Sequence, residues 1–191
     1  KSGNYMVFFS SYRMMEETAE AFTELLETEE MHPQLILQQQ GMTEAEREAF
    51  LVRFEETPPE GLIGFCVMGG IFSEGIDLKA ERLIGAIVVG PGLPQICRER
   101  ELLKNFYDAR GEDGFFYAYL CPGMNKVLQS AGRVIRTEAD EGVILLLDER
   151  FAAARYRNLF PAEWQAPQTC TLQTVQGCLA KFWSERQTER I

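Results

Sequence analysis

The stretch Tyr5-Met-Val-Phe-Phe9 is a short apolar run of aromatic and β-favouring residues. Such a run predicts a buried β-strand. Ser10-Ser11 follows it directly and offers an N-cap for a helix. From Tyr12 to about Glu29 the apolar residues recur at helical spacing, at Met15, Ala19, Phe22 and Leu26. The sequence therefore predicts one strand followed by one helix.

The same alternation of strand and helix continues along the chain. Further strands are expected at residues 34–38, 62–68, 84–89 and 143–147. Helices are expected at about 43–54, 95–109, 115–120, 122–135, 150–159 and 172–186, the first of them opened by a capping box at Thr43–Glu46. This pattern predicts an α/β fold in which helices cover both faces of a parallel sheet. The simplest organisation is a single domain over residues 1–191.

The composition is that of a folded domain. Hydrophobic residues make up 46% of the 191 residues and charged residues 25%, which excludes a disordered tail, a collagen-like fibre and a disulfide-dense mini-scaffold. No apolar run approaches the roughly 18 residues of a membrane helix, and no signal peptide pattern is present. We expect an intracellular, cytoplasmic protein, of bacterial type. Because the chain does not begin with Met, we interpret it as a fragment of something larger.

The net charge of −10 argues at first against a nucleic-acid partner, because phosphate binding needs a basic surface. The charge is, however, unevenly distributed. Residues 1–60 hold 13 acidic and 4 basic residues, whereas residues 61–191 hold 16 acidic and 15 basic residues. The acidity is thus concentrated in the first two helices, where we interpret it as a solvated outer surface. The overall charge does not decide the partner.

The cysteines and the histidine give no sign of a metal site. The chain has five cysteines, at positions 66, 97, 121, 170 and 178. Their number is odd, and no two of them have Cys-x-x-Cys spacing. This fits neither a disulfide framework nor a zinc site, so we expect reduced thiols. His32, the only histidine, lies in a Met-His-Pro turn, so no histidine metal cluster or Ser-His-Asp triad can be built.

The most informative stretch is Gln129-Ser-Ala-Gly-Arg133-Val-Ile-Arg136. On a helix, these three numbered positions are i, i+4 and i+7, and their side chains share one face. Two guanidinium groups on one face suit a polyphosphate, because each can donate two parallel hydrogen bonds. The alternative is a solvated basic stripe, or ion pairs with the nearby acidic residues.

A second stretch, Gly69-Gly-Ile-Phe-Ser-Glu-Gly-Ile-Asp77, follows the strand at 62–68 directly. Its glycines allow close backbone approach and expose N–H groups to anions. A glycine-rich loop alone is weak support for a site. Since it is not Gly-x-Gly-x-x-Gly, it gives little support to a Rossmann dinucleotide site.

Together these stretches resemble superfamily 2 DNA helicases of the XPD/DinG branch. Residues 69–78 look like motif V of that branch, residues 129–142 look like its motif VI, and Phe8-Phe-Ser-Ser-Tyr12 is similar to its motif IV. The order and spacing agree over roughly residues 4 to 160. The resemblance implies a RecA-like fold, and motif VI is its most specific element.

Other family elements are absent from the sequence. No Gly-x-x-x-x-Gly-Lys-[Ser/Thr] occurs, and no cysteine matches the ligands of the family's iron–sulfur cluster. Leu145-Leu-Leu-Asp-Glu149 imitates a Walker B strand, but without a P-loop we reject it as a magnesium site. The resemblance therefore implies the C-terminal, second RecA-like domain of an ATP-dependent helicase. Its ATP and Mg²⁺ would be shared with a first motor domain, and any iron–sulfur cluster would lie elsewhere in the parent, so we expect this chain to be inactive alone.

The resemblance also implies roles for individual residues. Arg136 matches the family's arginine finger, Arg133 its companion and Gln129 its nucleotide-contacting glutamine. Gly75 and Asp77 match motif V positions that link the nucleotide to the nucleic-acid track. Candidate contacts to single-stranded DNA are hydroxyl and aromatic groups, at Ser10, Ser11, Tyr12 and Ser73.

Two other interpretations stay open. A RecA-like module could bind nucleic acid or protein without turnover, although such a module has no need of the Gln/Arg/Arg triplet. A free-standing nucleotide-binding α/β protein is disfavoured because P-loop and dinucleotide fingerprint are both missing from the sequence. The cellular pathway, whether repair, recombination or the removal of replication conflicts, is not fixed by these residues.

Overall fold

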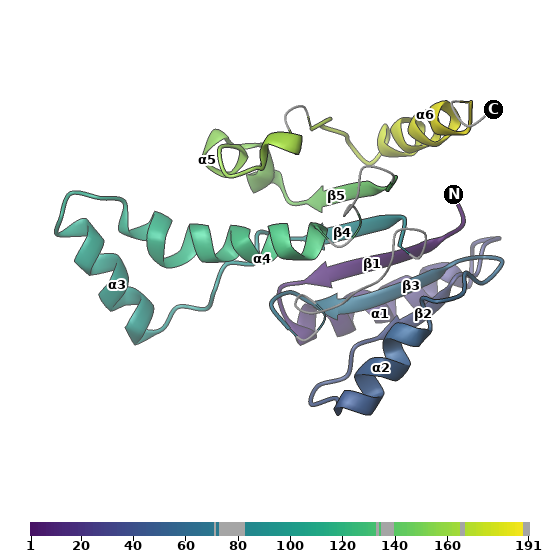
Figure 1. Ribbon diagram of the computed structural model, residues 1–191, viewed down its shortest axis with the longest axis horizontal. Coiled ribbons are helices and arrows are strands. Elements are labelled where there is room, and N and C mark those ends of the chain that lie inside the picture. Colours follow the sequence, from purple (N-terminus) through teal and green to yellow (C-terminus); the bar gives the residue numbers. More distant parts are fainter. Residues whose placement is uncertain (71, 73–82, 133, 135–139, 165–166, 189–191) are drawn as a thin grey trace. The chain divides into compact units, whose positions relative to one another are not determined.

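The core of the protein is a five-stranded parallel sheet with the strand order β2-β3-β1-β4-β5 (Figure 1). The computed structural model describes residues 1–70, 72, 83–132, 134, 140–164 and 167–188. The strands are β1 (Asn4–Phe9), β2 (Gln34–Leu37), β3 (Leu62–Val67), β4 (Gly85–Val89) and β5 (Val143–Leu147). All four pairings between neighbours are parallel. The α/β fold with a parallel sheet is confirmed.

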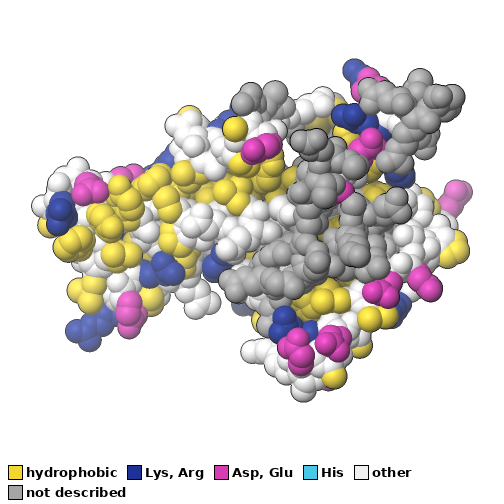
Figure 2. Space-filling view, viewed as in Figure 1, with side chains coloured by type: hydrophobic (Ala, Val, Ile, Leu, Met, Phe, Trp, Pro, Cys, Tyr) yellow, Lys and Arg dark blue, Asp and Glu magenta, His cyan; other side chains and the backbone are white. Residues whose placement is uncertain are grey.

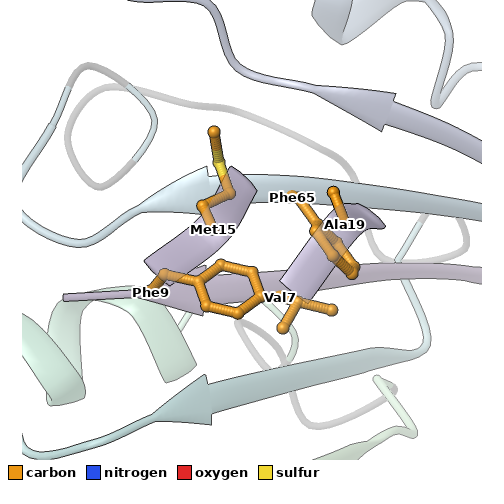
Figure 3. Close-up of a cluster of buried hydrophobic side chains, with 5 residues drawn as sticks. All are labelled: Val7, Phe9, Met15, Ala19 and Phe65. Atoms are coloured by element: carbon orange, nitrogen blue, oxygen red, sulfur yellow. The ribbon is translucent and has the colours of Figure 1, made fainter. Parts of the chain in front are cut away.

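The two faces of the sheet are covered by different helices. Helix α1 (Tyr12–Leu26) lies behind the sheet in Figure 1, where Met15 and Ala19 pack with Val7, Phe9 and Phe65 from the strands (Figure 3). Helix α2 (Glu44–Val52) covers the opposite face: a Cβ atom on Gly64 of β3 would lie 2.6 Å from the Phe54 ring just beyond that helix. Two neighbouring residues of β3, Gly64 and Phe65, thus face helices on opposite sides of the sheet. Burial on both sides explains why the strands are rich in apolar residues.

Both of these helices begin where the sequence predicts. The Ser11 hydroxyl caps α1 by accepting a 3.3 Å hydrogen bond from the Met14 N–H. The capping box of α2 is complete, because the Glu46 carboxylate accepts from the Thr43 N–H at 2.7 Å while the Thr43 hydroxyl accepts from the Glu46 N–H at 3.4 Å. The hydrogen bonds from Thr43 hold the pKa of Glu46 below its ordinary value.

Between β4 and β5 the chain forms a helical arm: α3 (Arg98–Asp108), a π-helix η1 (Phe116–Leu120) and α4 (Cys121–Ala131). The π-helix arises at a proline. In an α-helix the Ala118 carbonyl would accept from the N–H of residue 122, and Pro122 has none. Arg100 of α3 donates to that carbonyl instead, at 2.6 Å. Tyr119 donates to the Glu101 carboxylate at 2.6 Å, which raises the pKa of Tyr119 to about 12.

The outer side of this arm carries many exposed apolar side chains. Leu102 and Phe106 of α3 are 61% and 53% exposed. Figure 2 shows apolar side chains gathered over the part of the arm that lies beyond the sheet. The arm also carries a stacked pair of tyrosines, because the ring centroids of Tyr107 and Tyr117 lie 4.1 Å apart.

Two helix predictions need correction. The helix expected over 122–135 ends at Ala131, because Gly132 has a ψ of 3° and leaves the helical conformation. The helix expected over 150–159 is instead a 3₁₀ turn, η2 (Glu149–Ala152), and a short α5 (Ala154–Arg157). The extended backbone of Ala153, with ψ 141°, separates them.

The contacts group the chain into two compact units, Ser2–Leu159 and a smaller one of Phe160–Ile191 with Lys1. The smaller unit holds a 3₁₀ turn, η3 (Ala162–Trp164), and α6 (Val175–Thr188), close to the helix expected at 172–186. The single domain over 1–191 stays a prediction. Among the described residues, no helix combines the length and apolar character that a membrane span requires.

Candidate functional site

The loops that follow the strands meet at one edge of the sheet. Because all pairings are parallel, the strand ends align, as the register pairs Phe9 with Val67 and Val89 with Leu147. Beyond this carboxyl edge the chain continues as Ser10-Ser11 after β1, as Gly69-Gly70 after β3 and as Gly90-Pro-Gly92 after β4. The edge is where ligands of open α/β sheets bind.

The three predicted DNA contacts after β1 have different environments. Ser10 is exposed, and its hydroxyl lies 3.7 Å from the Met14 sulfur. Ser11 is half-buried and uses its hydroxyl as the cap of α1. Tyr12 is also half-buried, with its ring against the core cluster and its hydroxyl accepting from Gln38. Ser10 is thus the best placed of the three for a ligand, and all three contacts stay predictions.

Gln38 links three parts of this edge, and the sequence did not single it out. Its side chain is 2% exposed. The amide oxygen accepts from the Val67 N–H at 2.8 Å, and the amide nitrogen donates to the Tyr12 hydroxyl at 2.8 Å. Gln38 therefore holds the end of β3 and the first turn of α1 in a fixed relation. Nothing in Gln38-Gln-Gln40 distinguishes it from its two exposed neighbours.

We expect Gln38→Leu to lower the free energy of unfolding by about 2 kcal/mol, because it leaves the half-buried Val67 N–H without its acceptor. Urea unfolding measures this as a lower midpoint at unchanged slope. Gln39→Leu is the matched control, since Gln39 is exposed, and its effect should stay within about 0.5 kcal/mol. Equal effects of the two substitutions would show that the Gln38 hydrogen bonds carry no stability.

A lysine lies over the glycines of this edge. Gly69 and Gly92 both have left-handed backbones, with φ of 70° and 60°. A Cβ atom on Gly69 would lie 3.0 Å from Cε of Lys126, and one on Gly92 would lie 3.6 Å from its Cβ. Lys126 of α4 therefore carries its ammonium group to the start of the Gly69 loop. It precedes Gln129 by three residues, a helical spacing that could have indicated it from the sequence.

A hollow of about 230 Å³ opens at the same edge, between the ends of β1, β4 and β5. Ser10, Met14 and Gly90 line it together with Asp148 and Arg150. Most small-molecule sites have volumes of roughly 300–1,000 Å³. The hollow therefore favours contact with one part of a long ligand over enclosure of a small one.

Asp148 and Arg150, which line this hollow, form a bidentate ion pair. Arg150 donates from Nε and Nη2 to the two carboxylate oxygens of Asp148, at 2.8 Å and 2.7 Å. These bonds hold the pKa of Asp148 below its ordinary value and raise the pKa of Arg150. Asp148 is the acid of the Walker B-like sequence, and both of its oxygens are engaged by Arg150.

The predicted nucleotide-binding residues are only partly within the described structure. The side chain of Gln129 is exposed near the end of α4 and makes no hydrogen bond to another described residue. The remaining predicted site residues lie outside the described residues: Ser73, Gly75, Asp77, Arg133 and Arg136.

Comparison with known proteins identifies the fold and the family. The profile of the helicase C-terminal domain family matches residues 1–167. The chain belongs to this family. It is 29% identical over 161 residues to a probable ATP-dependent helicase of Methanocaldococcus jannaschii, a match that covers 79% of the chain and 24% of that protein. It is also 29% identical over 153 residues to the ATP-dependent DNA helicase DinG of Photobacterium profundum, with 79% of the chain and 21% of that protein covered.

A solved XPD helicase structure matches this helicase domain with a TM-score of 0.60 at 18% identity, over 82% of the chain and 26% of that structure. The RecA-like fold is thereby confirmed, as is the resemblance to the XPD/DinG branch. The chain spans about a quarter or less of the length of these two curated relatives. Within the described part of the domain, no three His, Cys, Asp or Glu side chains come together as possible metal ligands.

Proposed function

We propose that this helicase domain is the second motor domain of an ATP-dependent DNA helicase and that it supplies both arginine fingers and part of a single-stranded DNA track. The family match over residues 1–167 carries the proposal. Its relatives include proteins named as ATP-dependent helicases. The carboxyl edge of the sheet, with the exposed hydroxyl of Ser10 and the half-buried Lys126, supports it further.

On the nucleotide side, Gln129, Arg133 and Arg136 would face ATP and Mg²⁺ held mainly by a first motor domain. The exposed amide of Gln129 fits that role, because it can donate and accept hydrogen bonds without leaving α4. Gly75 and Asp77 would connect this side to the DNA track. We place any iron–sulfur cluster in another part of the parent protein.

On the DNA side, the track would run along the carboxyl edge. Ser10 offers a hydroxyl to phosphate at the hollow, and Lys126 offers a cation beside the exposed backbone of Gly69. We assign Ser11, Tyr12 and Ser73 to the same track. Asp148 and Arg150 also line the hollow, and because they form a bidentate ion pair they add little net charge to it.

We expect this chain alone to bind single-stranded DNA weakly, with a dissociation constant of about 10⁻⁴ to 10⁻⁶ M that weakens as salt increases. Fluorescence anisotropy with a labelled oligonucleotide at several salt concentrations measures both quantities. Lys126→Gln should reduce the slope of log K against log salt by about 0.7, because one phosphate contact is lost.

Lys104→Gln is the matched control for this measurement. Lys104 has the same charge, but it is paired with Asp108 at 2.8 Å on the helical arm. Its loss should leave the salt slope unchanged. A binding constant that ignores salt would exclude a phosphate-binding track, and equal slopes for the two variants would remove Lys126 from it.

A further inference from the structure

Helix α3 of the arm buries none of its eleven residues, all of which are described. One side of the helix is half-buried against η1, where Arg100 and Glu101 are hydrogen-bonded to the Ala118 carbonyl and the Tyr119 hydroxyl. The opposite side is exposed. A helix in a folded protein ordinarily packs an apolar face against another element, because most of its stability comes from that packing. The exposed side of α3 is therefore the side to inspect.

The exposed side of α3 carries an apolar stripe. Leu102 and Phe106 are more than half exposed, and Leu103 is 40% exposed. The two leucines precede Phe106 by four and three residues, so the three side chains share one face of the helix. We call these three residues the α3 stripe. Contiguous exposed apolar side chains mark surfaces that contact another macromolecule.

The α3 stripe has opposite charges at its two ends. Glu99 stands seven residues before Phe106 and Arg110 four residues after it, so both lie on the face of the stripe. The Arg110 guanidinium lies over the Phe106 ring, 5.2 Å from the ring centroid. Both charged residues are exposed, and Nε of Arg110 is 3.8 Å from the Glu112 carboxylate, too far for a hydrogen bond. The face thus begins with an acid and ends with a base.

A face with this order of side chains is complementary to itself. If two α3 helices pack antiparallel about a twofold axis, Glu99 of each copy faces Arg110 of the other. In the same register Leu103 of each copy faces Phe106 of the other, since both pairs have the same midpoint along the helix. We propose that two copies of this chain associate through their α3 stripes in this antiparallel arrangement. Charges that flank an apolar seam set the orientation of paired helices, and twofold contacts are the commonest among homo-oligomers.

Other occupants fit this face less well. Exposed aromatic rings can stack on nucleic-acid bases, but residues 98–113 hold five acidic and four basic residues. Phosphate binding needs an excess of basic residues, so the arm does not suit a nucleic acid. Parallel packing of two copies is also disfavoured, because it would set Glu99 against Glu99 and Arg110 against Arg110.

The expected association is weak. A helix of eleven residues is only about 16 Å long. One pair of such helices covers less than the roughly 1,200 Å² that stable complexes bury. The dimer should therefore form and dissociate as the protein concentration changes, and it goes beyond the proposed motor function without depending on it.

The test is sedimentation equilibrium of the chain over a concentration series that extends into the millimolar range. We expect the average mass to rise toward twice that of one chain. Glu99→Arg and Arg110→Glu should each weaken the association by about 10- to 10²-fold, because each sets like charges against one another twice in the dimer. An equimolar mixture of the two variants should associate again, since every arginine then faces a glutamate. Arg13→Glu, at an exposed arginine of α1, is the matched control and should associate like the unsubstituted chain.

Three outcomes would overturn the proposal. The mass of one chain at every concentration would mean that a second copy does not cover the α3 stripe. Association that survives Leu102→Asp would place the contact on another face. Failure of the mixed variants to associate, while the unsubstituted chain does, would exclude the antiparallel arrangement. Thermal unfolding of each variant checks that the fold persists, as expected for exposed positions. The readout needs neither nucleotide nor DNA, so the result stands apart from the proposed motor function.

Discussion

Arg136→Ala, in a polypeptide that carries both motor domains, is expected to lower DNA-stimulated ATP hydrolysis by about 10³- to 10⁵-fold and to abolish unwinding. Charge develops around the γ-phosphate during phosphoryl transfer, and an arginine supplied from the facing domain stabilises it. Arg136→Lys should rescue poorly, because an ammonium group does not reproduce the planar, two-pronged guanidinium. Steady-state ATPase at saturating single-stranded DNA measures the effect.

The DNA affinity of the same variant separates the two possible roles of Arg136. We expect it to stay nearly unchanged. Arg110→Ala is the matched control, since Arg110 is an exposed arginine near Glu112 on the helical arm, and its turnover should remain within a few-fold of the unsubstituted protein. If Arg136→Ala retains most of its turnover, the finger assignment is wrong. If the DNA affinity collapses while unstimulated hydrolysis persists, Arg136 contacts DNA instead of nucleotide, as the non-catalytic module would require.

The strands were predictable from sequence because each is a short apolar run bounded by glycine, proline or polar residues. The run at 143–147 gave β5 with its bounds unchanged, and the run at 62–68 gave β3 with one residue fewer. Burial on both faces requires apolar residues at every position, and this signal is local. The two caps at Ser11 and Thr43 are local as well, which is why α1 and α2 begin as expected.

Some features that the sequence did not indicate depend on contacts between residues that are distant in the sequence. Helical spacing alone does not distinguish an α-helix from a π-helix. The Ala118 carbonyl, which has no N–H partner at Pro122, accepts a hydrogen bond from Arg100, 18 residues earlier in the sequence. Two residues of the candidate site, Gln38 and Lys126, were not singled out from the sequence, because their partners are also distant along the chain. Gln38 acts through Val67, 29 residues away, and only the fold brings Lys126 of α4 to Gly69, although its helical spacing from Gln129 was visible in the sequence.

The placement of α4 depends on a close backbone contact that a second substitution tests. A Cβ atom on Gly123 would lie 2.7 Å from the Pro91 carbonyl oxygen and 2.9 Å from Cδ2 of Leu93. The helix therefore rests directly on the turn after β4. Gly123→Val should lower the free energy of unfolding by about 3 kcal/mol, because neither the backbone oxygen nor the β-branched side chain can yield without moving the helix. Gly123→Ala should cost less, since its gain in helix propensity, about 1 kcal/mol, offsets part of the clash.

We expect Gly123→Val to affect ATP hydrolysis as well, because α4 carries Gln129 and precedes the two arginines in the sequence. A displacement of about 1 Å at a positioning element can lower turnover by about 10²-fold. We expect Gly123→Val to reduce ATP hydrolysis by about this factor in a polypeptide with both motor domains, measured below its unfolding temperature. Gly177→Ala on α6 is the control: nothing lies within 4 Å of the added Cβ, so it should stabilise by up to about 1 kcal/mol and leave turnover unchanged. Unaltered stability of Gly123→Val would mean that α4 does not rest on the Pro91 turn. Reduced stability with full turnover would mean that the position of α4 does not control the nucleotide side.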